Sequence, residues 1–205
     1  MSRSFAVVLP VKPPAVGKSR LDALGSELRA QLAVAFALDT VTAAVGARSV
    51  ERVVVATDDQ EISRVVADLG CLVVPDAGGL NEALVAAVAA VRRLLPHALP
   101  VALCADLPCL RPSDLDEALT RLPQLGAGFV ADASGTGTTT YAAPFDLFQP
   151  RFGPDSRARH LEAGAVELAG APARLRRDVD DPDDLVAARA LGVGARTAAV
   201  LARLS

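Results

Sequence analysis

The chain has few aromatic side chains and no excess of positive charge. Aromatic residues make up 3% of its 205 residues, with six Phe, one Tyr and no Trp, and the formal net charge is -3. Proteins that bind nucleic acid usually carry a basic surface and stack aromatic rings on bases. This composition therefore argues against a general nucleic-acid-binding protein.

Histidine and cysteine are also scarce. With only two His in the chain, no combination of Ser, His and an acidic residue indicates a hydrolase triad. Cys71, Cys104 and Cys109 are odd in number and lie in apolar surroundings, so we expect buried thiols in a reducing compartment. A zinc site built from Cys104, Cys109 and His97 is disfavoured, because such sites need about four ligands with recognisable spacing.

Long uncharged apolar runs are missing as well. No run approaches the roughly 20 residues that a transmembrane helix needs. The first residues, MSRSFAVVLPV, lack the shape of a signal peptide, because their apolar part is short and leads directly into lysine and proline. We therefore expect a cytoplasmic protein with no membrane partner.

Apolar segments are nevertheless abundant, at 51% hydrophobic residues, and they alternate between two patterns. The expected strands are Phe5–Val11, Arg52–Thr57, Cys71–Val74, Pro100–Ala105, Gly128–Ala133, Thr138–Ala143 and Ala173–Val179. The expected helices are Ser26–Val45 with Ser26 as N-cap, Asp59–Leu69, Asn81–Leu95, Pro112–Leu122, a short helix within Phe152–Ala163, Pro182–Leu191 and Ala195–Leu204. This alternation predicts an α/β fold: one domain over residues 1–205, with a mostly parallel twisted sheet and helices on both faces.

A basic segment, LPVKPPAVGKSRL at Leu9–Leu21, separates the first expected strand from the first expected helix. Lysines supply charge, glycine allows close approach of the backbone, and N–H groups at a helix start add donors, so this segment suits a phosphate. The GKS at residues 17–19 is a poor P-loop match, because that motif needs glycine where the chain has Lys12. We predict a phosphate-binding loop of another design, with a solvated basic loop as the alternative.

Carboxylates follow two later expected strands, at the end where ligands bind in open parallel sheets. Asp106 comes directly after the fourth expected strand, and a capping or loop aspartate is the alternative for it. In the run RDVDDPDDL, Asp178 and Asp180 alternate about one valine and would share one face of a strand. We predict these three as magnesium ligands, whereas Asp181 before Pro182 is the expected N-cap of the next helix.

A third polar group lies in FGPDSRARH, residues 152–160. Ser156 together with free N–H groups at a helix start would form a second anion site, and Arg157 and Arg159 would add charge. The run GTGTTT at residues 135–140 offers hydroxyl groups in the same half of the chain. The alternatives are that Thr138–Thr140 is only an edge strand and that His160 is a surface residue.

Five motifs together resemble one family. VKPPAVGKSRL, GGLNEAL, ADLPCL, FGPDS and RDVDDPDDL are similar to the motifs of the CofC/FbiD guanylyltransferases, which have a MobA-like nucleotidyltransferase fold and act in the biosynthesis of coenzyme F-420. The resemblance implies transfer of GMP from GTP to a three-carbon phosphoacid with release of pyrophosphate. Actinobacterial members use phosphoenolpyruvate and archaeal members use 2-phospho-L-lactate; the alanine- and arginine-rich composition favours the former.

The resemblance also implies roles for individual residues. The phosphoacid falls to Thr138, Gly153 and Ser156, and two Mg²⁺ ions fall to Asp106, Asp178 and Asp180. The nucleotide falls to Lys12, Gly17, Lys18, Ser19, Arg20, Gly79 and Asn81, with Lys18 and Asp106 taking part in catalysis and Asn81 a candidate for reading guanine. A downstream transferase that accepts the unstable product is an implied partner.

The chemistry expected from the residues agrees with this resemblance. A phosphate monoester is largely dianionic near pH 7, since its second pKa is about 6, so the acceptor needs no general base. Lysines and magnesium would instead screen the charge between two anions. Two alternatives stay open: the same fold acting on another acceptor, such as a sugar phosphate or a molybdopterin, and a subunit that binds GTP without turning it over.

Overall fold

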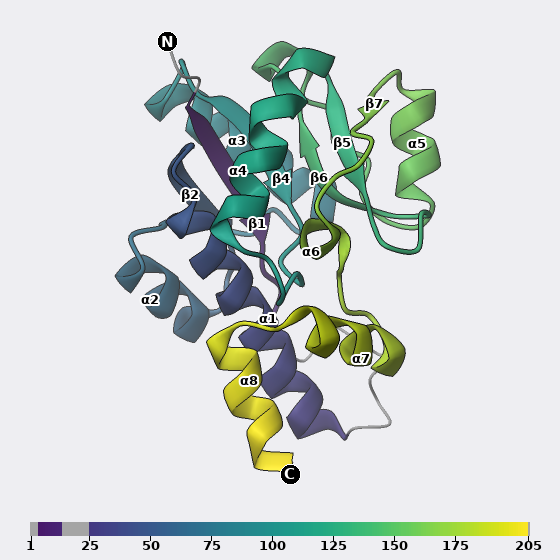
Figure 1. Ribbon diagram of the computed structural model, residues 1–205. Coiled ribbons are helices and arrows are strands. Elements are labelled where there is room, and N and C mark those ends of the chain that lie inside the picture. Colours follow the sequence, from purple (N-terminus) through teal and green to yellow (C-terminus); the bar gives the residue numbers. More distant parts are fainter. Residues whose placement is uncertain (1–3, 14–24, 205) are drawn as a thin grey trace.

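The strands form one sheet in which a single strand runs opposite to the others. The computed structural model describes residues 4–13 and 25–204, and within them seven strands lie in the order β3-β2-β1-β4-β6-β5-β7 (Figure 1). In this described part, β6 is antiparallel to both of its neighbours and the other adjacent strands are parallel. The strands are β1 (Phe5–Pro10), β2 (Val50–Ala56), β3 (Leu72–Val74), β4 (Leu99–Leu103), β5 (Gly128–Ala131), β6 (Thr138–Ala142) and β7 (Val166–Glu167).

Helices cover both faces of this sheet, as predicted. α1, α2, α4 and α6 supply side chains to the apolar cluster on one face, and α3 supplies them to the cluster on the other. The helices are α1 (Ser26–Gly46), α2 (Gln60–Asp68), α3 (Leu80–Leu94), α4 (Pro112–Arg121), α5 (Ser156–Glu162), α6 (Ala173–Arg176), α7 (Pro182–Leu191) and α8 (Ala195–Leu201), with 3₁₀ turns η3 (Leu122–Leu125), η4 (Phe145–Leu147) and η5 (Ala202–Leu204). The predicted α/β class is confirmed.

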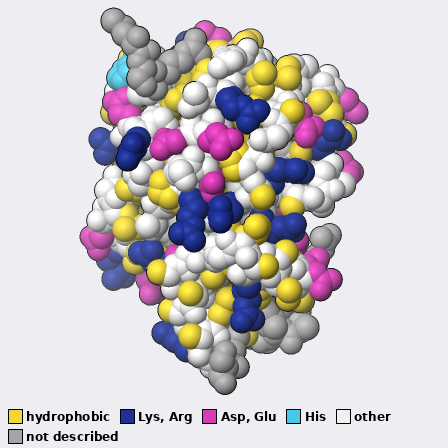
Figure 2. Space-filling model, in the orientation of Figure 1, with side chains coloured by type: hydrophobic (Ala, Val, Ile, Leu, Met, Phe, Trp, Pro, Cys, Tyr) yellow, Lys and Arg dark blue, Asp and Glu magenta, His cyan; other side chains and the backbone are white. Residues whose placement is uncertain are grey.

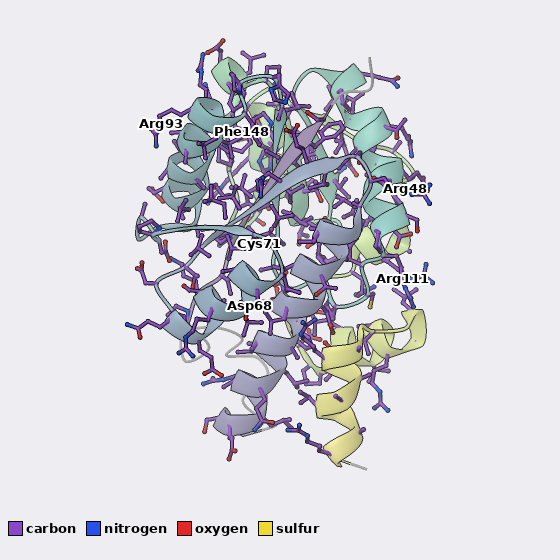
Figure 3. The ribbon with its side chains drawn as sticks, turned by 90° about the vertical axis from the view of Figure 1, so that its left-hand side faces the viewer. Arg48, Asp68, Cys71, Arg93, Arg111 and Phe148 are labelled. Atoms are coloured by element: carbon purple, nitrogen blue, oxygen red, sulfur yellow. The ribbon has the colours of Figure 1, made fainter. Side chains whose placement is uncertain are left out.

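The composition of β1 explains why both faces can be covered. Phe5, Val7 and Leu9 belong to one apolar cluster, whereas Ala6 and Val8 belong to the other. A strand buried on both faces must be apolar at every position, and the run FAVVL meets that requirement. Figure 3 labels one member of each cluster inside the protein, Cys71 on the α2 side and Phe148 on the α3 side.

Capping side chains account for two helix starts. The Asp59 carboxylate accepts hydrogen bonds from the N–H groups of Glu61 and Ile62, which begins α2. Asp181 accepts from the N–H of Asp184, with Pro182 at the first helical position of α7, as predicted. The prediction for Ser26 was wrong, because α1 begins at Ser26 itself and the preceding Gly25 offers no side chain to cap it.

The chain before Asp178 also differs from the prediction. We expected a strand over Ala173–Val179, but the helical turn α6 occupies its first half and the rest belongs to no strand. The turn begins at Pro172, whose carbonyl accepts hydrogen bonds from the two N–H groups at residues 175 and 176, and Leu175 is fully buried beneath it. The extra strand is instead β7, which is too short to show a periodic pattern in the sequence.

α1 ends one residue after the helix predicted at Ser26–Val45 and is more apolar than the sequence analysis allowed. α1 has 21 residues, and its most apolar 18-residue window has a mean hydropathy of 1.4, which meets the length and composition expected of a membrane-spanning helix. More than half of that window, 56%, is buried inside the protein. α1 packs against β2, α4 and α8, so it forms part of the protein core.

The three cysteines are free thiols. Burial raises the pKa of Cys71 and of Cys109 to about 11, which keeps both groups protonated near neutral pH. Within residues 4–13 and 25–204, no three His, Cys, Asp or Glu side chains are arranged to hold a metal. The expectation of buried thiols is confirmed for Cys71 and Cys109, whereas Cys104 is half-buried.

Candidate functional site

The predicted functional groups gather at one edge of the sheet. β1 and β4 are neighbours, and the connection that leaves β1 runs toward β2 whereas the connection that leaves β4 runs to the opposite side; ligands of open α/β sheets bind at such a point. Lys12 follows β1 by two residues, and Asp106 follows β4 by three. Because β6 is antiparallel, its first residue, Thr138, lies at the same edge, where the N–H of Cys104 donates to the carbonyl of Thr139 over 2.8 Å.

Lys12 is tied to the loop between β3 and α3. Its ammonium donates to Asp76 Oδ2 over 2.5 Å and to the carbonyl of Gly78 over 2.6 Å. The Asp76 carboxylate is nearly buried, with 7% of its side chain exposed, and also accepts from the N–H of Gly78. The sequence analysis gave Asp76 no role, although it lies two residues after the strand predicted at Cys71–Val74. Lys12 and the Gly78–Asn81 turn therefore form one unit.

The other predicted residues of the basic loop, Gly17, Lys18, Ser19 and Arg20, lie outside the described residues. Gly79 is among the described residues and immediately precedes α3. The Glu82 carboxylate, in the first turn of that helix, packs against Gly79. A β-carbon at position 79 would overlap that carboxylate. The close approach explains why glycine suits this position.

The Asn81 side chain is already engaged by the protein. Its Nδ2 donates to the carbonyl of Phe152 over 3.0 Å, and its Oδ1 accepts from the N–H of the same residue over 2.9 Å. Asn81 was predicted as a candidate reader of guanine. In this structure the amide instead joins the start of α3 to the turn that precedes Ser156.

The acidic segment that contains Asp178 and Asp180 lies beside Asp106. The N–H of Val179 donates to the carbonyl of Asp106 over 3.2 Å, and the Val179 side chain is fully buried against α1 and α7. This anchor places Asp178 and Asp180, the two neighbours of Val179, next to the end of β4. The prediction of a strand here was wrong, and the prediction that Asp106, Asp178 and Asp180 bind magnesium stays a prediction.

These donors suit a divalent cation of the hard type. Carboxylate oxygens are the ligands that Mg²⁺ prefers, and Mg²⁺ commonly takes one or two of them and completes its shell with phosphate oxygens and water. Asp106 is half-buried and Asp180 is exposed, so a bound cation would remain accessible to a phosphate. The chemical type of these donors suits the predicted metal, but no three acidic side chains of the described residues are grouped to hold one, so the site at Asp106, Asp178 and Asp180 stays a prediction.

A β-bulge turns Thr138 away from the next two threonines. Thr138 pairs with Ala131 and Thr140 with Val130, so three residues of β6 oppose two of β5. Thr139 donates to the carbonyl of Leu175 on the α6 side. Thr138 faces the opposite side, where its Oγ1 lies 3.0 Å from Nδ1 of His160. Bulges often re-aim a side chain near a functional site.

The turn before α5 carries the other predicted acceptor residues. Gly153 has a φ of 117°, a conformation that glycine adopts readily, and Asp155 at 53° is the one non-glycine residue with positive φ in the described chain. Ser156 begins α5 and is 2% exposed. The Gly153–Ser156 turn is thus tightly bent and partly enclosed.

The predicted anion site of free N–H groups at Ser156 was wrong. The N–H of Ser156 donates to the carbonyl of Gly153, and the N–H of Arg157 donates to the carbonyl of Thr136, each over 3.1 Å. Arg157 also directs its charge elsewhere, because its Nε donates to Glu167 over 2.8 Å. Arg159 stays near the turn, with a guanidinium nitrogen 3.7 Å from the place of a β-carbon on Gly153.

His160 is not the surface residue that the sequence allowed. It is fully buried and stacks on the rings of Phe129 and Tyr141, with centroid distances of 5.3 Å and 4.8 Å. Burial lowers its pKa to about 4, so the ring is neutral near pH 7. The helical spacing of Ser156 and His160, four residues apart on one face, is the sequence signal that could have indicated its burial.

Positive charge also gathers outside this edge. Figure 2 shows Lys and Arg side chains close together in the middle of one face, over the region where Figure 1 places α4 and α6. Arg111, Arg174 and Arg177 lie near enough to Cys109 to favour its thiolate. Arg177 donates to Asp184 over 2.8 Å, which places part of this charge beside the acidic segment.

Comparison with known proteins finds relatives over nearly the whole chain. The cytidylyltransferase family model matches residues 39–148. A phosphoenolpyruvate guanylyltransferase from Thermomonospora curvata is 49% identical over 206 residues, covering 98% of this chain and 90% of that protein.

Solved structures share the fold at low sequence identity. A Desulfovibrio desulfuricans protein assigned to the nucleotide-diphospho-sugar transferases has a TM-score of 0.71 at 19% identity, covering 99% of this chain and 95% of that one. Rv0371C from Mycobacterium tuberculosis, solved with manganese, has a TM-score of 0.56 at 18% identity, covering 92% and 98%. Given the near full-length match at 49% identity, the chain belongs to the phosphoenolpyruvate guanylyltransferase family of nucleotidyltransferases.

Proposed function

We propose that the protein transfers GMP from GTP to the phosphate of phosphoenolpyruvate and releases pyrophosphate, giving enolpyruvyl-diphospho-guanosine for coenzyme F-420 biosynthesis in the cytoplasm. The observation that carries the proposal is the gathering of Lys12, Asp106 and Thr138 at one edge of the sheet, beside the β1/β4 switch point. A cation, a carboxylate and a hydroxyl there match the needs of a reaction between two anions.

The reaction is a displacement at the α-phosphorus of GTP. An oxygen of the phosphoenolpyruvate phosphate forms a bond to that phosphorus, and the bond to the β-phosphate oxygen breaks, so that pyrophosphate leaves with the electron pair. The attacking phosphate is already largely dianionic near pH 7, because its second pKa is about 6. No side chain has to remove a proton, which agrees with a neutral, buried His160.

The chain's own residues hold and align the two substrates. We assign GTP to the loop containing Lys12, Gly17, Lys18, Ser19 and Arg20 and to the turn at Gly79–Asn81. A lysine about 4 Å from a phosphate oxygen interacts by roughly 4 kcal/mol at an effective dielectric constant near 20, so the basic loop contributes a large share of phosphate affinity. The Asp76 carboxylate holds Lys12 beside the Gly79–Asn81 turn.

We assign the divalent cation, two Mg²⁺ ions, to Asp106, Asp178 and Asp180. When bound, the metal neutralises the charge that builds up on the phosphates during transfer. Val179 keeps the two segments together through its hydrogen bond to Asp106. The phosphoacid is assigned to Thr138, Gly153 and Ser156, with Arg159 as the nearby cation.

A pyrophosphate-release assay tests the proposal. The protein is incubated with GTP, Mg²⁺ and either phosphoenolpyruvate or 2-phospho-L-lactate, and inorganic pyrophosphatase removes the product so that an unfavourable equilibrium does not hide turnover. We expect phosphate to form with phosphoenolpyruvate. Faster turnover with 2-phospho-L-lactate would reassign the acceptor, and no turnover with either acid would contradict the proposed function. A downstream transferase that consumes the unstable product is a further proposed partner, tested by co-purification.

A further inference from the structure

The hydrogen bonds of His160 determine which of its ring nitrogens carries the proton. Nε2 lies 3.0 Å from the backbone nitrogen of Arg151, and a backbone N–H can only donate. Nε2 must therefore be the acceptor and carry no hydrogen. In a neutral ring the hydrogen is then on Nδ1, which lies 3.0 Å from Oγ1 of Thr138. His160 thus donates to the hydroxyl oxygen of Thr138, and the backbone of Ser156 is a further hydrogen-bond partner of the ring.

This direction has a consequence for the Thr138 hydroxyl. An oxygen that accepts from Nδ1–H retains its own hydrogen for a second partner. With the other tautomer, a bare Nδ1 would take up the hydroxyl hydrogen and leave Thr138 as an acceptor only. An acceptor pointed at a phosphate or carboxylate would repel it. The N–H of Arg151 therefore decides, through the imidazole ring, whether Thr138 can donate to an anion.

The ring has little freedom to turn. Phe129 and Tyr141 stack on it at interplanar angles of 23°, and Phe152 meets it edge-on at 5.6 Å. Rotating the ring by half a turn would break both hydrogen bonds within a packed aromatic environment. Burial also keeps the ring neutral, so one tautomer and one orientation persist near pH 7.

We propose that His160 is a positioning residue that orients the Thr138 hydroxyl so that it donates its hydrogen to the anionic acceptor substrate. The proposal rests on the proposed function, in which Thr138 binds the phosphoacid. His160 itself does not touch the reacting atoms. The hydrogen bond from the N–H of Arg151 sets the tautomer of the ring, and the hydrogen bond to Thr138 orients the hydroxyl group.

Two amide variants separate these roles. In His160→Asn the side-chain amide can occupy the place of Nδ1 and still donate to Thr138. In His160→Gln the side-chain amide reaches the place of Nε2. It can still accept from the N–H of Arg151 but no longer donates to Thr138. Both residues are neutral and smaller than the imidazole, so the loss of ring stacking is shared and each variant controls for the other.

The test is steady-state turnover with GTP and phosphoenolpyruvate, together with the binding of phosphoenolpyruvate by calorimetry. For His160→Gln we expect the KM and Kd for phosphoenolpyruvate to rise about tenfold, the size of one lost hydrogen bond, with the KM for GTP unchanged. For His160→Asn we expect a rise of at most about threefold, because the donor to Thr138 is kept. Equal losses in the two variants, or a larger loss in His160→Asn, would overturn the proposal.

A double variant gives an independent readout. Thr138→Val removes the hydroxyl at nearly constant volume, and in that background His160→Gln should raise the KM for phosphoenolpyruvate no further. If the two substitutions instead raised the KM for phosphoenolpyruvate by the product of their separate effects, His160 would act otherwise than through Thr138. If His160→Gln does not fold, His160→Asn decides alone, since a tenfold loss there contradicts the inference. A wild-type protein that neither binds nor consumes phosphoenolpyruvate would instead defeat the proposed function.

Discussion

Asn81 uses its whole side-chain amide on one residue, Phe152. Nδ2 donates to the carbonyl and Oδ1 accepts from the N–H of that residue, over 3.0 Å and 2.9 Å. Asn81 is the second residue of α3 and belongs to the turn assigned to GTP, and Phe152 precedes the turn assigned to the phosphoacid. The preceding N–H, that of Arg151, is held by His160. Two side chains from separate helices thus hold consecutive residues of one loop.

Asn81→Asp tests this link between the two halves of the site. The carboxylate can still accept from the N–H of Phe152 but cannot donate to its carbonyl, so the turn is released and the two oxygens repel. We expect kcat/KM for phosphoenolpyruvate to fall about tenfold, as for the loss of one buried hydrogen bond. A loss confined to the KM for GTP would show instead that Asn81 reads the nucleotide directly, as first predicted from the sequence.

Asp106→Asn tests the metal assignment. Replacing the carboxylate by an amide removes a charged ligand at nearly constant shape, so we expect kcat to fall about 100-fold or more while GTP still binds. Asp183→Asn, which changes an exposed carboxylate in the first turn of α7, is the matched control and should leave kcat unchanged. Full activity of Asp106→Asn would remove Asp106 from the metal site.

Ser156→Ala tests the acceptor assignment. The hydroxyl is almost fully buried beside the Gly153 turn, and the N–H groups there already bind backbone carbonyls. The hydroxyl is therefore the donor that the serine can offer, and its loss should raise the Kd for phosphoenolpyruvate by about tenfold, with less effect on GTP. Calorimetry with each substrate in turn measures the two losses, and equal losses would argue against this role.

The pH dependence of stability follows from the buried His160. Its pKa is about 4 in the folded state against 6.5 when exposed, so between these values the unfolded chain binds a proton that the folded chain does not. The free energy of unfolding therefore decreases as pH falls from 6.5 to 4, by up to about 3 kcal/mol from this residue. Above pH 6.5 the ring is neutral in both states and contributes no slope.

Urea unfolding across this range measures the effect. Arg151 and Tyr141 are the ionisable groups with a resolved interaction or contact at the ring, and neither changes charge between pH 4 and 6.5. We expect His160→Asn to lose most of the slope. An unchanged slope in His160→Asn would assign the pH dependence to other groups.

Several elements could be predicted because their cause is local. The run FAVVL predicts a strand that is buried on both faces. The pair Asp181–Pro182 predicts the start of a helix from two neighbouring residues alone. The α/β class follows from the alternation of such segments. The strand predicted at Ala173–Val179 does not form, and the reason is not local. Its partner would lie far away in the sequence, and what forms instead is a single hydrogen bond from Val179 to Asp106.

The sequence by itself determined the order of the elements, the motifs and the chemical types of the candidate groups, because charge and apolar spacing are properties of neighbouring residues. Only the tertiary structure decided how those groups meet. The antiparallel course of β6 brought Thr138 to the edge that holds Lys12 and Asp106, and the packing of α5 buried His160 against Thr138. These outcomes depend on contacts between residues 22 or more positions apart, whose geometry is set by the packing of the whole sheet.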